Sequence, residues 1–87
     1  MKHLYITIEH LVNDKMQKTE VKLVDVPITI LETIQKVLHY EKQGRTRQIH
    51  PADSLSASHY IEHAVSIAKR SAKISEDETC FWKARVA

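Results

Sequence analysis

Apolar and polar residues alternate through the N-terminal third of the chain, in two runs separated by a short polar stretch. In the first run Leu4 and Ile6 fall on the same face of an extended strand, and residues 17–26 repeat the alternation. Asn13 and Asp14 lie between the runs, and both residue types tolerate the left-handed backbone of a tight turn. The pattern predicts an antiparallel β-hairpin. Two strands alone are only marginally stable, so we expect this hairpin to pack on other elements.

A helical stripe follows the predicted hairpin. Thr29 and Glu32 have the spacing of a capping box, in which each side chain satisfies a free amide at a helix start. Apolar residues then recur at helical spacing from Ile30 to Leu38. The single glycine of the chain, Gly44, stands where a helix commonly ends in the left-handed conformation. The sequence therefore predicts a first helix that ends at this glycine.

A second helix is expected to begin at Ser54 or Ser56 and to run to about Ile74. Its apolar stripe is rich in alanine, which permits close packing against a neighbouring element. Residues 45–55, which contain a proline, are expected to form the connection between the two helices.

The C-terminal residues 79–86 fit two structures. Ser75 and Glu78 have capping-box spacing, which would start a short third helix. As a strand, the same segment would place Trp82 on the core-facing side together with Cys80, Ala84 and Val86. The aromatic residues and the alternation favour the strand. We therefore expect a single α+β domain, residues 1–87, with a hairpin packed on two helices and a third strand (ββααβ) or a short third helix.

Composition excludes several classes of function. With 13 basic and 11 acidic residues, the formal net charge of +2 is too small to indicate nucleic-acid binding by itself. One glycine among 87 residues excludes the glycine-rich loops of Walker-type and dinucleotide-binding sites. No nucleophile with an adjacent base and no pair of carboxylates emerges from the sequence. We therefore expect no enzymatic activity and no cofactor.

Cysteine usage and hydropathy indicate the compartment. Cys80 is the only cysteine, so no disulfide forms within the chain, whereas small secreted domains usually depend on disulfides. The N-terminus lacks the apolar run of a signal peptide, and no stretch approaches the roughly 20 apolar residues of a membrane span. These features favour a soluble, cytoplasmic protein without membrane attachment.

The histidines offer a candidate metal site. His59 and His63 are four residues apart, so a helix would present both imidazoles on one face. His50 or Asp53 would supply a third ligand and Cys80 a fourth. Residues 59–63 have the His-x-x-Glu-His order of inverzincin peptidases, which we attribute to chance because the chain is too short for the rest of such an enzyme. The structural interpretation is an exposed helix face, because a chain with six histidines produces such a pair easily by chance.

Basic residues gather in two regions. Arg45 and Arg47 follow the first predicted helix. Lys69, Arg70 and Lys73 lie near the end of the second. If the two regions adjoin, they form a positive patch that would meet a phosphate backbone or an acidic protein surface. The structural interpretation of the same residues is that cations in the last turn of a helix stabilise the helix by opposing its dipole.

The tail adds Lys83 and Arg85, which a strand would place on the face opposite Trp82, where they would contact a partner. We therefore expect a small intracellular, non-enzymatic interaction module that docks onto a macromolecule, as accessory regulators and inhibitors do. A protein is the first expected partner and nucleic acid the second. The alternative is a metal- or small-ligand-binding domain built on His59 and His63.

Self-association is a further expectation. The predicted outer strand from Lys2 to Glu9 carries β-forming residues between its two charged ends. An open edge of this kind pairs readily with a strand of another chain. If the protein is a homodimer, this strand is the expected contact.

Overall fold

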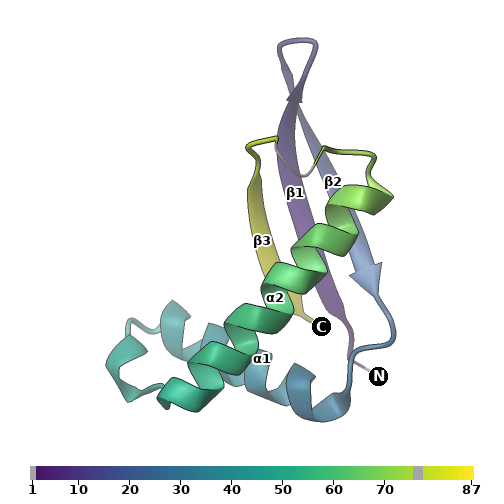
Figure 1. Cartoon of the computed structure of the whole chain (residues 1–87). Helices are drawn as coiled ribbons and strands as arrows, with labels where there is room; N and C mark the ends of the chain where they lie inside the picture. The colour runs from purple at the N-terminus through teal and green to yellow at the C-terminus, as the bar shows by residue number, and fades with distance from the viewer. Residues whose placement is uncertain (1, 76–77) are drawn as a thin grey trace.

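The computed structural model describes residues 2–75 and 78–87 of the chain. Its elements appear in the order expected for a ββααβ domain, which confirms that prediction (Figure 1). They are β1 (Leu4–Val12), β2 (Lys15–Leu23), α1 (Ile28–Lys42), the 3-10 helix η1 (Thr46–Gln48), α2 (Pro51–Ser71) and β3 (Phe81–Val86).

The hairpin of β1 and β2 is joined by a two-residue turn. Asn13 and Asp14 both have positive φ, of 51° and 64°, and the flanking residues Val12 and Lys15 pair directly. Two consecutive left-handed residues define the type I′ turn, whose twist matches that of the strands. The predicted hairpin and its turn are confirmed.

The C-terminal segment is a strand, so the alternative of a short third helix is wrong. β3 pairs antiparallel with β1, from Leu4 opposite Val86 to Glu9 opposite Phe81. The strand order is β2-β1-β3. The segment expected to be an open edge for dimerisation therefore lies in the middle of the sheet, with a strand on each side. The prediction that a second chain pairs there is wrong, because β3 of the same chain occupies that edge.

Helix α1 begins without a capping side chain. Its N-cap is Pro27, whose carbonyl accepts the amides of Ile30 and Leu31, both at 3.0 Å. Thr29 lies inside the first turn, so the predicted capping box does not form. The chain enters the helix earlier than the box indicates because the backbone of Pro27 (φ −57°) already has an N-cap geometry.

Helix α2 also begins earlier than expected, at Pro51. His50 is its N-cap, and the imidazole Nδ1 accepts the backbone amide of Ala52 at 3.1 Å. Proline at the first helical position has no amide to leave unsatisfied. The serines at positions 54 and 56, which the sequence suggested as the start, lie within the helix.

Both helices end in the same backbone motif. At α1 the left-handed residue is Gly44 (φ 71°), and at α2 it is Lys73 (φ 59°). The amide of the next residue, Arg45 or Ile74, donates to the carbonyl five residues earlier, at 2.9 and 2.8 Å. These are Schellman motifs. The role predicted for the glycine is confirmed, whereas Lys73 adopts a conformation that costs a side-chain-bearing residue about 1–2 kcal/mol.

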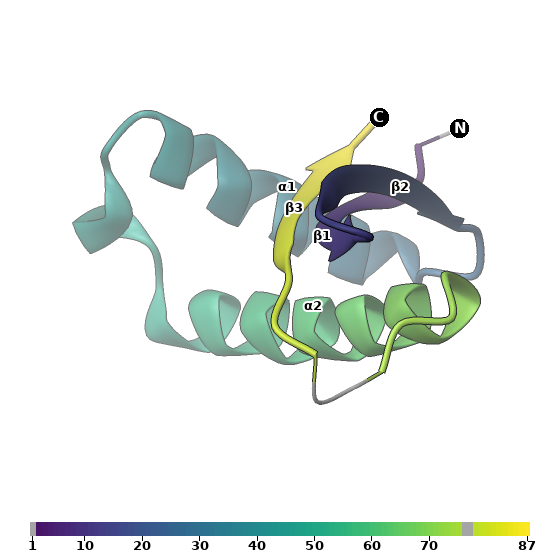
Figure 2. The ribbon, with the colours of Figure 1, turned by 90° about the horizontal axis from the view of Figure 1, so that it is seen from above.

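The two helices cover one face of the sheet, so the domain has two layers (Figure 2). α2 crosses β1 and β2, and α1 packs against α2 and β3. Within the described residues, no helix combines the length and the apolar character needed to cross a lipid bilayer. The core between the layers consists of aliphatic side chains from every main element except β3. They are Leu4, Ile6, Ile8, Leu23, Val26, Leu31, Ile34, Val37, Ala57, Ile61, Ala64, Val65, Ala68 and Ile74.

Candidate interaction surface

Among residues 2–75 and 78–87, no helix covers the second face of the sheet, which we call the open face. Because successive side chains of a strand point to opposite faces, the register assigns residues to it directly. Four basic and two acidic residues share this face with apolar and aromatic ones. The open face consists of Tyr5, Thr7, Glu9, Leu11, Met16, Lys18, Glu20, Lys22, Phe81, Lys83 and Arg85.

Part of the charge on the open face is neutralised within the chain. The Arg85 guanidinium lies 4.3 Å from the centre of the Tyr5 ring, and its Nη2 contacts both carboxylate oxygens of Glu20 at 3.3 and 3.2 Å. Lys18 is 3.7 Å from Glu9. Within residues 2–75 and 78–87, no ion pair involves Lys22 or Lys83. The open face therefore keeps uncompensated positive charge, and Lys83 carries it on β3.

Two adjacent aromatic residues of β3 are exposed. Phe81 lies on the open face with 70% of its surface exposed, and Trp82 lies on the opposite face with 45% exposed. The sequence identified the face of Trp82 correctly, because its cross-strand partner is the buried Ile8. Phe81 was missed as a candidate. The signal that could have identified Phe81 is the pair of neighbouring aromatic residues in an alternating strand, because only one residue of such a pair can face the core.

The sequence led us to expect Trp82 in the core, and this is wrong, because 45% of its surface is exposed. It forms one wall of a groove of about 290 Å³ between the sheet edge, α1 and α2. The helices diverge beyond β3 towards η1 (Figures 1 and 2), and the Trp82 side chain stays partly exposed. The other groove residues are Val37, Leu38, Glu41, Ser54, Ala57, Ser58, Ile61 and Glu62.

The outer edge of β3 presents unpaired backbone groups. His3 and Ala87 exchange both of their amide–carbonyl hydrogen bonds, at 2.8 and 3.1 Å, so they form a hydrogen-bonded pair. Such pairs alternate along an antiparallel ladder, which directs the amides and carbonyls of residues 81, 83 and 85 towards β1. Those of Trp82, Ala84 and Val86 point to the free edge. Among the described residues, no backbone hydrogen bond reaches them from another element.

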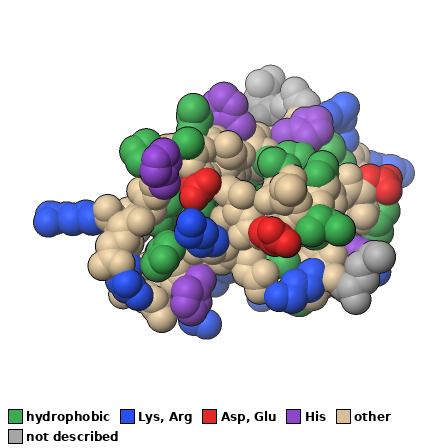
Figure 3. All heavy atoms as spheres, turned by 90° about the horizontal axis from the view of Figure 1, so that it is seen from below, with side chains coloured by type: hydrophobic (Ala, Val, Ile, Leu, Met, Phe, Trp, Pro, Cys, Tyr) green, Lys and Arg blue, Asp and Glu red, His purple; other side chains and the backbone are tan. Residues whose placement is uncertain are grey.

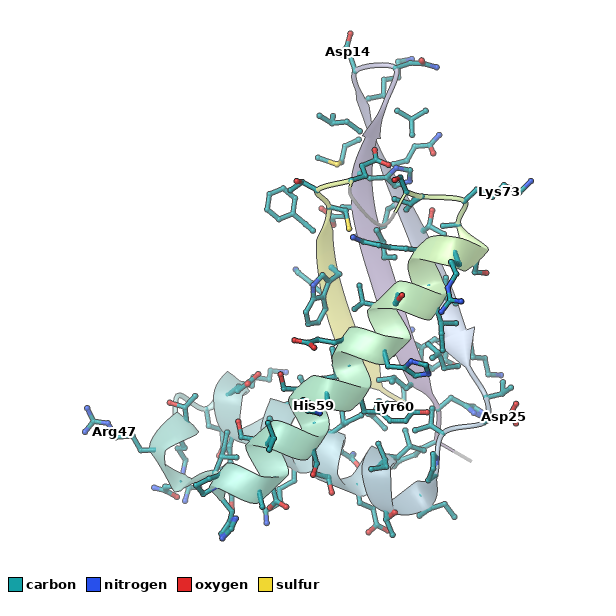
Figure 4. The ribbon with its side chains drawn as sticks, viewed as in Figure 1. Asp14, Asp25, Arg47, His59, Tyr60 and Lys73 are labelled. Carbon is teal, nitrogen blue, oxygen red and sulfur yellow. The ribbon has the colours of Figure 1, made fainter. Side chains whose placement is uncertain are left out.

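The two basic regions predicted at the helix ends are not brought together. Arg47 lies in η1, before α2, and Lys73 follows the last turn of α2 (Figure 4). The 21 residues of α2 separate them by about 30 Å at 1.5 Å per residue. Seen from below, Lys and Arg side chains are scattered over the surface without forming one patch (Figure 3). The condition on which a joint positive patch depended is therefore not met.

The individual basic side chains of these regions also have local contacts. Arg45 lies over the Tyr40 ring at 5.2 Å and donates to the side-chain oxygens of Gln43 and Gln48, which fixes the connection to η1. Lys69 donates to the Glu78 carbonyl at 3.2 Å. Arg70 is exposed in the last turn of α2, where its charge opposes the helix dipole.

The histidines do not converge on one point. His59 and His63 lie on α2, and His63 packs edge-on against Tyr60 with ring centres 6.0 Å apart. His63 and Tyr60 line a groove of about 440 Å³ beside β2 and the segment that follows it. His50 uses Nδ1 to cap α2. Over residues 2–75 and 78–87, no three His, Cys, Asp or Glu side chains gather closely enough to hold a metal ion. The predicted third and fourth metal ligands are therefore not assembled with the histidine pair.

Comparisons of the chain with protein-family models, with curated proteins and with solved structures find no match.

Proposed function

We propose that this chain is a non-enzymatic interaction module that docks onto a protein partner through the β3 side of the domain. The observation that carries the proposal is the exposure of two consecutive aromatic residues of β3, Phe81 on the open face and Trp82 on the groove side, next to an outer strand edge that has no partner among the described residues. Solvent-exposed apolar groups that lie together mark interaction sites, and tryptophan is among the residues that contribute most to protein–protein binding.

The charge distribution favours a protein over a nucleic acid. A nucleic-acid strand is held by a continuous track of cations and by aromatic faces on which bases stack. On the open face, Arg85 already covers the Tyr5 ring and contacts Glu20. The basic residues Arg47 and Lys73 lie too far away to extend the track, at opposite ends of α2. Within residues 2–75 and 78–87, Lys83 has no ion pair and lies beside the aromatic surface of β3, which suits a protein partner with acidic residues.

An accessory regulator or inhibitor needs no more than such a surface. Binding of the β3 side to a larger protein would cover a functional region of that partner or recruit it, without any chemistry by the domain. The absence of a glycine-rich loop from the sequence is consistent with this role.

A photo-cross-linking experiment tests the proposal. A photoreactive phenylalanine analogue replaces Phe81 in one chain and Leu55, another exposed apolar residue, in a control chain. Both are irradiated in nuclease-treated extract of the native cell. We expect a protein adduct at position 81 that excess unlabelled wild type removes and excess Trp82→Ser chain does not. Adducts that are equally abundant at position 55, or that the Trp82→Ser chain removes as well, would contradict docking through β3.

A further inference from the structure

The layer of helices is wider than the sheet that it covers. The connection from α1 through η1 to α2 extends past β3, on the side away from the hairpin (Figures 1 and 2). The groove bounded by Trp82, Val37 and Ile61 lies under this overhang. Its lining residues are those that a strand next to β3 would cover. The helices thus provide a surface for a sheet of four strands, and the described part of the chain supplies three.

The backbone of β3 can hydrogen-bond to such a strand. Trp82, Ala84 and Val86 direct their amides and carbonyls outwards, at the two-residue spacing that an added strand requires. The second edge of the sheet, β2, is less suited to this. It carries Lys15, Lys18, Glu20 and Lys22 along its length, and frequent charges protect an edge from pairing.

We infer that the partner contributes an extended segment that adds to β3 as a fourth strand, with apolar residues facing the groove and acidic residues on the open face. This inference rests on the proposed function and specifies the partner's chemistry. Side chains that face the groove would meet Trp82 and Leu38. Side chains on the other face would lie beside Lys83, which has no ion pair within residues 2–75 and 78–87. Opposite charges in adjacent strands stabilise the pairing.

A second copy of this chain fits the same edge poorly. Antiparallel pairing of β3 with β3 of another copy would place both helical layers on the same side of the joint sheet. Each layer extends past its own β3, so the two overhangs would compete for the space above the shared edge. The pairing would also bring Lys83 and Arg85 of both copies together on one face, where like charges repel. A separate protein segment without a helical layer avoids both conflicts.

Two synthetic peptides of about seven residues test the inference, since this is a typical strand length. One alternates glutamate and valine, and the other alternates lysine and valine. Each is titrated into the full-length chain at low salt and followed by NMR. We expect the glutamate peptide to bind about tenfold more tightly, because two cross-strand charge pairs change from repulsive to attractive. Amide exchange of Trp82, Ala84 and Val86 should slow on binding, while that of Lys83, which already faces β1, should not change.

Charge reversal provides the matched control. In a Lys83→Glu chain the lysine peptide should become the tighter ligand. In a Lys22→Glu chain, altered at the far edge of the same face, the glutamate peptide should remain tighter. Equal affinities of the two peptides would overturn the inference, and so would slower amide exchange in β2 on peptide binding. A chain that dimerises without peptide and already shows slow exchange of the Trp82 amide would overturn it as well. Photo-cross-linking at position 81 separates the two proposals. If specific adducts form at position 81 but neither peptide binds, the proposed docking function is supported and the addition of a fourth strand is refuted.

Discussion

Replacement of Trp82 by alanine separates the contribution of this residue to stability from its contribution to binding. The side chain is 45% exposed, so a little over half of its surface is removed from water by the groove. Truncation of a fully buried tryptophan costs about 3–5 kcal/mol. In proportion to its burial, the Trp82→Ala chain should lose about 2 kcal/mol and remain folded. For a domain of this size, that loss lowers the melting temperature by about 10 °C.

Urea denaturation followed by far-ultraviolet circular dichroism is the suitable assay, because the substitution removes the only tryptophan. Two reference variants bracket the result. Ile34→Ala, at a site with no exposed surface, should cost more, about 3–4 kcal/mol. Leu55→Ala, at a residue with 59% exposure, should change stability by less than about 0.5 kcal/mol. A Trp82→Ala chain that unfolds outright, or that is as stable as wild type, would refute the placement of the indole in the groove.

Three further predictions follow from the backbone and the surface charge. Lys73→Gly should stabilise the chain by about 1 kcal/mol, because glycine adopts the left-handed conformation without a side-chain clash, and Gly44→Ala should destabilise the chain by a similar amount. Thermal denaturation measures both changes, and melting temperatures equal to that of the wild type would contradict the positive φ angles of these two residues. Asp14→Gly, which creates the preferred Asn-Gly type I′ turn, should raise the melting temperature by a few degrees, and a decrease would argue against this turn. Lys83→Glu should weaken binding of the partner captured at position 81 by about fivefold in a competition assay, whereas Arg47→Glu, remote from β3, should leave it unchanged.

The sequence predicts the local structure of this domain well. Alternation identifies the two strands of the hairpin and favours a third over a helix, and the residue types at Asn13 and Asp14 identify the turn. Gly44 marks the end of α1 because few other residues adopt its backbone conformation. The helix starts were missed since they depend on Pro27 and on a histidine cap at His50, for which the periodicity carries no signal.

The candidate site depends on tertiary arrangement, which the pattern does not specify. Alternation assigns Trp82 to the core-facing side but cannot show how far the helices extend over that edge. It also cannot give the strand order, so the central position of β1 and the free edge of β3 emerged only with the fold. The positions of the basic residues at the predicted helix ends likewise did not show whether Arg47 and Lys73 adjoin. Their separation is determined by the length of α2, which lies between them.

The most direct test of docking through β3 is the fluorine NMR spectrum of the chain labelled with 5-fluorotryptophan. Trp82 is the only tryptophan, so a single resonance reports on the groove beside β3, and the unlabelled partner contributes no signal. On addition of the protein captured at position 81, we expect this resonance to shift and broaden as the indole is buried. Saturating binding that leaves both its position and its width unchanged would contradict the claim that the partner covers the β3 edge.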